Sequence, residues 1–406
     1  MQTQIISGGV TAPKGFKAAG IHAGIRKNKD KLDLALLVSE VPCATAAVYT
    51  QNKVKGAPIT VTKNNIADGY AQAMLCNSGN ANTCNADGLE LAEKCCGLVA
   101  QALGLKTSDI VIASTGVIGQ PLPLEPFEYG IPLAVKALSA QGGSQAAEAI
   151  MTTDTRKKEY ALAFELDGKP CKMGIMTKGS GMINPNMATM LTFITTDVAI
   201  SPAMLQAALS QTVKQTLNQI SVDGDTSTND MASIMANGLA GNPVIEAANA
   251  DFEAFCQVLH QLCVWACREI AADGEGATKL LQCSVKNAPS QQVALAVAKS
   301  IISSDLFKSA MFGQDANWGR ILCAIGYTEG DFAIERVSVS LKSAKGEVLV
   351  CQNAAYHPFS EEEAAQILTE SEIEILVDMQ DGLEFAQAWG CDLTYDYVKI
   401  NGDYRS

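Results

Sequence analysis

The clearest periodicity in the chain lies in its C-terminal half. Between residues 252 and 270, apolar side chains recur at steps of three and four, which predicts an amphipathic helix that ends at Asp273-Gly274. Residues 291–303 predict a further helix. Residues 337–341 instead alternate apolar and polar side chains, and the turn at Lys345-Gly346 leads into a second apolar run, which predicts a β-hairpin.

Two other apolar runs predict strands. Residues 108–116 form a short strand that ends in a turn at Thr115-Gly116, and residues 187–194 form a buried strand. Small and turn-forming residues between Gly179 and Asn186 precede the second of these strands. Helices and strands are therefore mixed, and strands recur in adjacent pairs. This favours α+β layers over a strictly alternating doubly wound sheet.

The composition narrows the class of protein. Of the 406 residues, 48% are hydrophobic and 18% are charged, as in a compact globular protein. Thirty Lys and Arg against forty-three Asp and Glu give a net charge of −13, so we expect neither nucleic acid nor an anionic membrane as partner. We see no secretory signal and no apolar run that would span a bilayer. The thirteen cysteines lack the dense spacing of a disulfide scaffold, which predicts reduced thiols in a cytoplasmic protein.

Several common catalytic patterns are missing from the sequence. It contains no phosphate-binding P-loop and no glycine-rich dinucleotide fingerprint, and its three histidines are isolated from one another. Asp223-Gly-Asp225 resembles the start of a calcium loop, but the sixth position is Thr228 and the twelfth is not Glu. We interpret this segment as a capped turn and predict no metal site.

The chemistry of the central segment depends on Thr189. Its hydroxyl can attack the carbonyl of Ala188 through a five-membered ring, which shifts the acyl group from nitrogen to oxygen and frees the α-amine of Thr189. Water then cleaves the ester, which releases the carboxylate of Ala188 and restores the hydroxyl. Such an amine has a pKa of about 7.7–8.0, so it can accept the hydroxyl proton without a histidine. The alternative is an ordinary Gly/Asn/Pro-rich loop before a strand that happens to contain Thr, and from the residues alone this alternative is the commoner one.

The sequence from Lys178 to Leu191 closely resembles the cleavage motif of the ornithine acetyltransferase (glutamate N-acetyltransferase) family of arginine biosynthesis. The similarity extends from end to end. It includes residues 8–20, 77–84, 151–155, 221–230 and 390–406.

This resemblance implies a chain that cuts itself into an α fragment, residues 1–188, and a β fragment, residues 189–406, which assemble as an α2β2 heterotetramer. It implies layered domains of αββα type, similar to self-cleaving aminopeptidases and ornithine acetyltransferases. The implied reaction moves acetyl from N-acetylornithine to Thr189 and then to glutamate, without a cofactor. Some members of the family also use acetyl-CoA as a donor.

The resemblance further assigns roles to single residues. Thr115 and Gly116 would form the oxyanion hole, although a plain turn is the alternative. Lys178 suits a substrate carboxylate and Glu275 a substrate ammonium, whereas lone charges are more often solvated at the surface. Either Thr152 or Thr153 is the contacting threonine, and the spacing from Lys178 favours Thr152. The implied substrate contacts are Thr152, Lys178, Thr189, Glu275, Asn401 and Ser406.

Two other functions remain open at this point. A related N-terminal-nucleophile amidohydrolase or aminopeptidase would share the self-cleavage but pass the acyl group to water. A non-enzymatic binding protein that kept the fold would remain uncut.

Overall fold

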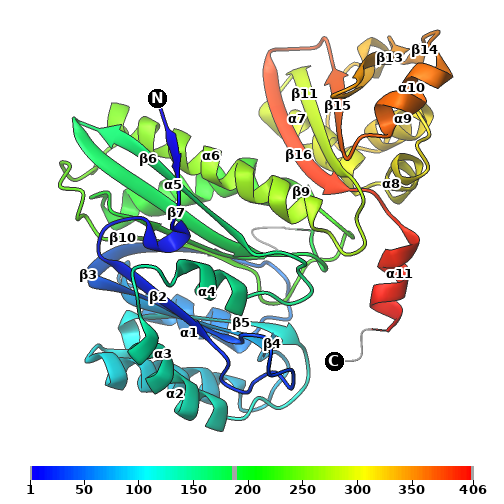
Figure 1. Ribbon diagram of the computed structural model, residues 1–406. Coiled ribbons are helices and arrows are strands. Elements are labelled where there is room, and N and C mark those ends of the chain that lie inside the picture. Colours follow the sequence, from blue (N-terminus) through cyan, green and yellow to red (C-terminus); the bar gives the residue numbers. More distant parts are fainter. Residues whose placement is uncertain (1, 185–189, 404–406) are drawn as a thin grey trace. The chain divides into compact units, whose positions relative to one another are not determined.

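The computed structural model describes residues 2–184 and 190–403, and its chain forms two compact units. The first contains residues 2–179, 190–214 and 226–266, and the second contains residues 180–184, 215–225 and 267–403. Each unit has its own sheet, with helices packed against it (Figure 1). This confirms the α+β class predicted from the sequence.

The first unit is built on a nine-stranded mixed sheet. In spatial order its path runs through β1 (Gln4–Ile6), β6 (Lys158–Leu166), β7 (Lys169–Lys178), β8 (Leu191–Thr196), β10 (Met231–Ala236), β3 (Leu34–Tyr49), β4 (Tyr70–Asn80) and β5 (Ile110–Val117). The remaining strand, β2 (Phe16–Ile21), pairs with the first part of β3. Strands β8 and β10 thus lie between β7 and β3, although β10 is more than 150 residues from β3 in the sequence.

Strands β3, β4 and β5 are buried on both faces. In β3, Leu34 and Leu36 pack into one apolar cluster, whereas Ala35 and Leu37 pack into another. The same alternation continues in residues 73–76 of β4 and 110–113 of β5. Successive side chains of a strand point to opposite faces, so near-continuous apolar runs are what a sheet covered on both sides requires.

The helices of the first unit cover these faces. Helices α2 and α3 contribute to the cluster around Leu34, and α4 contributes to the cluster around Leu37. The helices are α1 (Ala57–Asn65), α2 (Gly88–Leu103), α3 (Glu125–Ala137), α4 (Gly143–Ala149), α5 (Pro202–Gln215) and α6 (Ala250–Ala272), the last two of which end in the second unit. Short 3-10 turns lie at η1 (Gly9–Thr11) and η2 (Thr107–Asp109). Within the described ranges, no helix is both long and apolar enough to cross a membrane.

The second unit is built on a seven-stranded sheet. Its order is β14 (Ala355–Tyr356), β13 (Gly346–Gln352), β12 (Ser338–Ser343), β15 (Glu372–Asp378), β11 (Leu280–Ala288), β16 (Glu384–Cys391) and β9 (Ile220–Ser221). One face is apolar and is covered by helices, with Cys283, Val339 and Ile375 fully buried. In β11 the alternate residues Gln282, Ser284 and Lys286 are polar, and Ser284 Oγ donates to Glu374 Oε1 over 2.8 Å.

Five helices complete the second unit, and side-chain caps mark where they begin. Ser290, for example, accepts a hydrogen bond from the backbone N–H of Val293 at the start of α7, which satisfies an N–H that has no partner within the helix. The helices are α7 (Gln291–Ser303), α8 (Asp305–Phe312), α9 (Trp318–Gly326), α10 (Glu361–Leu368) and α11 (Tyr395–Gly402), with 3-10 turns at η3 (Leu217–Gln219) and η4 (Ile334–Arg336).

The structure tests the elements predicted from periodicity. Helices α6 and α7 and the β12–β13 hairpin are confirmed. The strand predicted to end in a turn at Thr115-Gly116 instead continues through both residues to Val117, because its parallel partner β4 continues to Asn80. The predicted strand over residues 187–194 is confirmed from Leu191 onward, and residues 187–189 lie outside the described part of the chain.

Candidate functional site

The residues predicted to act on the substrate divide between the two units. The first unit holds Thr115, Gly116, Thr152 and Lys178, and the second holds Glu275 and Asn401. Ala188, Thr189 and Ser406 lie outside the described residues.

Gly116 is in close contact with the neighbouring strand. It lies at the end of β5 with a φ of +133°, and a Cβ added there would stand 2.3 Å from the carbonyl carbon of Gly79. Only glycine accepts both the positive φ and this approach. Pairing between β4 and β5 becomes irregular at Asn80, so the backbone around Thr115 and Gly116 departs from the regular ladder. The N–H of Gly116 and the hydroxyl of Thr115 are suitable donors for an oxyanion.

A buried amide fixes the backbone immediately before this pair. Asn229 Nδ2 donates to the carbonyls of Ser114, over 3.0 Å, and Ala81, over 2.5 Å. Its Oδ1 accepts hydrogen bonds from the hydroxyls of Thr83 and Thr228. Every polar atom of the Asn229 side chain is therefore engaged, which makes this a fully satisfied buried network. Two of the stretches that carry the family resemblance, residues 77–84 and 221–230, meet at this point.

Lys178 lies at the end of β7 within a group of buried charges. Asp154 Oδ1 accepts from Lys158 Nζ at 2.7 Å and from the N–H of Gly179 at 2.8 Å, while Oδ2 accepts from the N–H of Thr152 at 3.0 Å. Burial alone would raise the pKa of Asp154, but the charges of Lys178 and Lys158 hold it well below its usual range. One ionised carboxylate therefore ties Thr152 to the segment that begins at Lys178.

The pKa of Asp230 is shifted in the opposite direction. Burial raises its pKa well above the ordinary value, and the hydrogen bonds from Ser227 and Thr50 and the charge of Lys178 offset this only in part. Its Oδ2 is buried and has no hydrogen-bond partner among the described residues. The first unit thus contains two buried carboxyl groups whose pKa values are shifted in opposite directions.

In the second unit, Glu275 and Asn401 are in direct contact. Asn401 Nδ2 donates to Glu275 Oε2 over 2.8 Å, and the backbone N–H of Glu275 donates to the carbonyl of Ser180 over 3.0 Å. A Cβ at Gly181 would stand 2.4 Å from the Glu275 carboxylate, so the glycine is needed for this side chain to lie where it does. Helix α11 carries Asn401, and its first turn is capped by Thr394.

Asp223 holds the segment that leads toward the predicted cleavage point. Its carboxylate accepts the N–H groups of Met182, over 2.6 Å, and Ile183, over 2.8 Å, as well as that of Asp225. The bond from Asp225 is the capped turn predicted from the sequence, whereas the contacts with Met182 and Ile183 were not predicted. Within residues 2–184 and 190–403, no group of three His, Cys, Asp or Glu side chains is placed to hold a metal ion.

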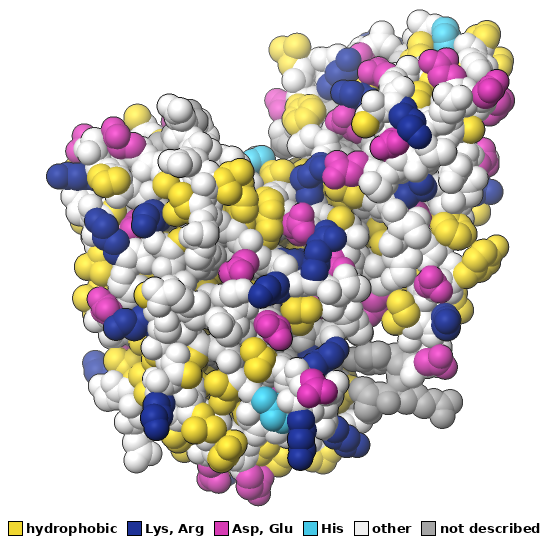
Figure 2. All heavy atoms as spheres, in the orientation of Figure 1, with side chains coloured by type: hydrophobic (Ala, Val, Ile, Leu, Met, Phe, Trp, Pro, Cys, Tyr) yellow, Lys and Arg dark blue, Asp and Glu magenta, His cyan; other side chains and the backbone are white. Residues whose placement is uncertain are grey.

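The cysteines are free, and the charges on the drawn surface are mixed. All thirteen cysteines lie in the described ranges and are free thiols, and burial raises the pKa of Cys43, for example, to about 12. On the face drawn in Figure 2, Lys and Arg side chains are interspersed with Asp and Glu.

Sequence reasoning overlooked several of the residues that organise the site. Asp154, Asn229 and Asp230 lie within stretches that carried the resemblance, yet no role was assigned to them. The available signal was a polar or charged residue beside a predicted contact, such as Asp154 two positions after Thr152. The sequence does not reveal which side chains are buried. Burial is what gives these three side chains their shifted pKa values or their fully satisfied hydrogen bonds.

Comparison with known proteins gives close relatives over nearly the whole chain. The ArgJ family matches residues 17–406. The chain is 48% identical over 404 residues to the arginine biosynthesis bifunctional protein ArgJ of Caldanaerobacter subterraneus subsp. tengcongensis, which covers 99% of this chain and 100% of that protein. Identity to the protein of the same name from Symbiobacterium thermophilum is 49%, over 99% of both chains.

A solved structure is also similar. The crystal structure of arginine biosynthesis bifunctional protein ArgJ from Bacillus halodurans matches with a TM-score of 0.50 and 45% identity. The match covers 52% of this chain and 98% of the solved chain.

Proposed function

This chain belongs to the ArgJ family, and on that premise we propose that it is an acetyltransferase of arginine biosynthesis that moves acetyl from N-acetylornithine to glutamate. The observation that carries the proposal is the 48% identity, over 99% of the chain, to a bifunctional ArgJ protein. The bifunctional name of the relatives supports a second activity, in which acetyl-CoA and glutamate give N-acetylglutamate and CoA.

We propose that the chain first cleaves itself between Ala188 and Thr189. The free α-amine of Thr189 then serves as the base for its own hydroxyl, so nucleophile and base belong to one residue. The hydroxyl attacks the acetyl carbonyl, ornithine leaves, and the acetyl group remains on Thr189 as an ester. The amine of glutamate attacks that ester, which yields N-acetylglutamate and restores the hydroxyl. No cofactor enters this cycle.

Thr115 and Gly116 are proposed to stabilise the oxyanion that forms in each half-reaction. The close packing of Gly116 on Gly79 and the hydrogen bond to the Ser114 carbonyl support this role, because they fix the donors before the substrate arrives. Donors that need no rearrangement are the effective ones in catalysis.

The remaining predicted contacts are proposed to hold the amino-acid part of the substrate. Thr152 and Lys178 are joined through Asp154, which supports a common role for the two, with Lys178 facing a carboxylate. Glu275 would face the ornithine ammonium, with its carboxylate oriented by Asn401. Ser406 is proposed to contribute its hydroxyl to substrate binding.

The size of the solved relative supports the cleavage. Nearly all of that polypeptide matches only about half of this chain, and a cut between Ala188 and Thr189 would give two fragments that are each about half the chain. We propose that these fragments assemble as an α2β2 heterotetramer. The free cysteines favour a reducing compartment, and we place the enzyme in the cytoplasm.

Mass spectrometry of freshly purified protein, paired with an acetyl-transfer assay, tests the proposal. We expect two fragments, the second beginning at Thr189, and glutamate-dependent transfer from N-acetylornithine. The Thr189→Ala variant should remain uncut and inactive. An intact and inactive wild-type chain would contradict the proposal and favour a binding protein.

The amidohydrolase alternative gives a different result in the same assay. A hydrolase would release acetate from N-acetylornithine at a rate that does not depend on glutamate. Replacing N-acetylornithine with acetyl-CoA measures the second activity, which should also require glutamate and an intact Thr189.

A further inference from the structure

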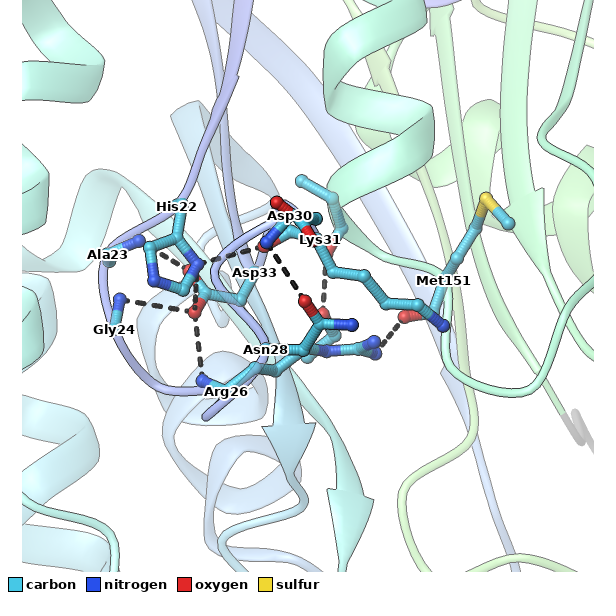
Figure 3. Close-up of polar contacts among 11 residues, drawn as sticks. His22, Ala23, Gly24, Arg26, Asn28, Asp30, Lys31, Asp33 and Met151 are labelled. Carbon is cyan, nitrogen blue, oxygen red and sulfur yellow. Dashed lines mark hydrogen bonds and ion pairs between the residues drawn. The ribbon is translucent and has the colours of Figure 1, made fainter.

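A buried carboxylate organises the loop between β2 and β3. Asp33 is fully buried, and its two oxygens accept the backbone N–H groups of Ala23, over 2.6 Å, Gly24, over 3.2 Å, and Arg26, over 2.9 Å (Figure 3). The ring of His22 adds a contact of 3.4 Å. These bonds fix the backbone of the loop, and with it the point from which the Arg26 side chain extends.

Arg26 reaches two segments that carry predicted site residues. Its guanidinium donates to the carbonyl of Met151, the residue before Thr152 (Figure 3). Its stem packs over Gly79, where an added Cβ would stand 2.8 Å from Arg26 Cγ. Gly79 is also the residue against which Gly116 packs. One cation is therefore in contact with the neighbours of both Thr152 and the proposed oxyanion hole.

A small pocket lies beside this guanidinium. It has a volume of about 90 Å³ and is lined by Arg26, Lys31, Leu32, Glu148, Met151 and Thr152. Sites that enclose whole small molecules measure roughly 300–1,000 Å³, so this pocket suits a single functional group. The lining contains two cations, Arg26 and Lys31, and one carboxylate, Glu148, so the pocket favours a ligand group of negative charge.

We propose that Arg26 binds the α-carboxylate of the amino-acid substrates, an inference that rests on the proposed function. The acetyl group is transferred to and from the α-nitrogen, so the α-carboxylate is only a few bonds from the reacting carbonyl. It is also the group that both substrates share, whereas their side chains end in opposite charges. The planar guanidinium adds two-point recognition of a carboxylate to the single charge of Lys178.

The test compares N-acetylornithine with its α-carboxamide, which lacks the negative charge. Acetyl-enzyme formation in a single turnover is followed by mass spectrometry, and KM is measured for glutamate. In Arg26→Gln we expect reaction with N-acetylornithine at limiting concentration to slow about ten- to a hundredfold, with a matching rise in KM for glutamate. Reaction with the carboxamide should change less than about twofold. Arg26→Lys should recover part of the loss because it restores the positive charge but not the two-point geometry of the guanidinium.

Lys27→Gln is the matched control, since Lys27 is a cation on the same loop and does not line the pocket. It should behave as wild type with both donors. Equal losses with N-acetylornithine and the carboxamide in Arg26→Gln would overturn the inference, because they would show that Arg26 only supports the Met151 backbone. A wild-type protein that neither transfers acetyl nor binds ornithine in calorimetry would overturn the proposed function, and this inference with it.

Discussion

At the scale of single residues, Thr115 and Gly116 depend on different parts of the fold. Position 116 must be glycine because a Cβ there would collide with the backbone of Gly79. The Thr115 hydroxyl, by contrast, can be removed by a substitution that adds no atoms. The threonine is therefore the position at which the proposed oxyanion hole can be tested with little disturbance of the backbone.

Thr115→Ala should lower kcat about 10²–10³-fold, the loss typical of one oxyanion donor, with a smaller change in KM. Thr115→Ser keeps the hydroxyl and should retain most of the activity. Steady-state kinetics with N-acetylornithine and glutamate measure both. Similar losses in the two variants would show that the methyl group, and not the hydroxyl, is what the site requires.

At the scale of elements, Asp154 joins the turn at Thr152 to the end of β7. Replacing it by Asn leaves the buried Lys158 without its ionised partner, and breaking a buried pair in this way costs about 3–5 kcal/mol. Asp154→Asn should therefore lower the free energy of unfolding measured in urea by that amount.

The additional change Lys158→Met should recover part of this stability, since it removes a buried charge that the Asp154 carboxylate no longer offsets. Asp331→Asn, at an exposed position, provides the control and should be neutral within about 0.5 kcal/mol. An Asp154→Asn variant as stable as this control would show that the carboxylate charge is not needed in the fold.

Helix α7 carries Lys299, whose shifted pKa should give stability a dependence on pH. Lys299 Nζ donates to the carbonyls of Asn218 and Ile220, and burial lowers its pKa to about 7. An unfolded lysine has a pKa near 10.4, so between these values the unfolded chain binds the proton more tightly. The stability of the folded protein should rise with pH between about 7 and 10.

Thermal unfolding of wild type and Lys299→Met at several pH values measures this effect. The difference in Tm, wild type minus variant, should increase from pH 7 to pH 9 and be constant below about pH 6. A difference that does not change with pH would show that Lys299 titrates alike in the folded and unfolded chain.

The sequence predicts an element well when the interactions that form it join residues close together in the chain. Helices α6 and α7 follow from side chains three and four positions apart, so periodicity was sufficient. The order of the strands could not be predicted, because the neighbours β10 and β3 are distant in the sequence. The contacts of Asn229 with Ser114 and of Arg26 with Met151 could not be predicted either, because each joins residues far apart in the sequence. The contact between Glu275 and Asn401, by contrast, joins two residues that the family resemblance had already named.

At the scale of the whole molecule, the proposed cut does not follow the compact units. Strands β8 and β10 belong to residues 189–406, yet they lie between β7 and β3 of residues 1–188 in the same sheet. Each fragment therefore supplies strands that the other needs in order to satisfy its backbone hydrogen bonds.

The two fragments should consequently remain together after cleavage. Native size-exclusion chromatography should give one peak that contains both, and denaturing electrophoresis should resolve two bands. Residues 1–188 expressed alone should be largely insoluble because β3 and β7 would expose unpaired edges. Separation of the fragments in buffer without denaturant would contradict this arrangement of the sheet.

If the chain is cut as proposed, the interleaved strands also make maturation a one-way step. Before the cut, β7 and β8 belong to one chain and pair with each other, so folding is unimolecular. After the cut, an unfolded enzyme regains its sheet only by an encounter of two separate polypeptides, at a rate that falls with dilution. The lifetime of the mature protein is then governed by how rarely it unfolds, and not by how readily it refolds.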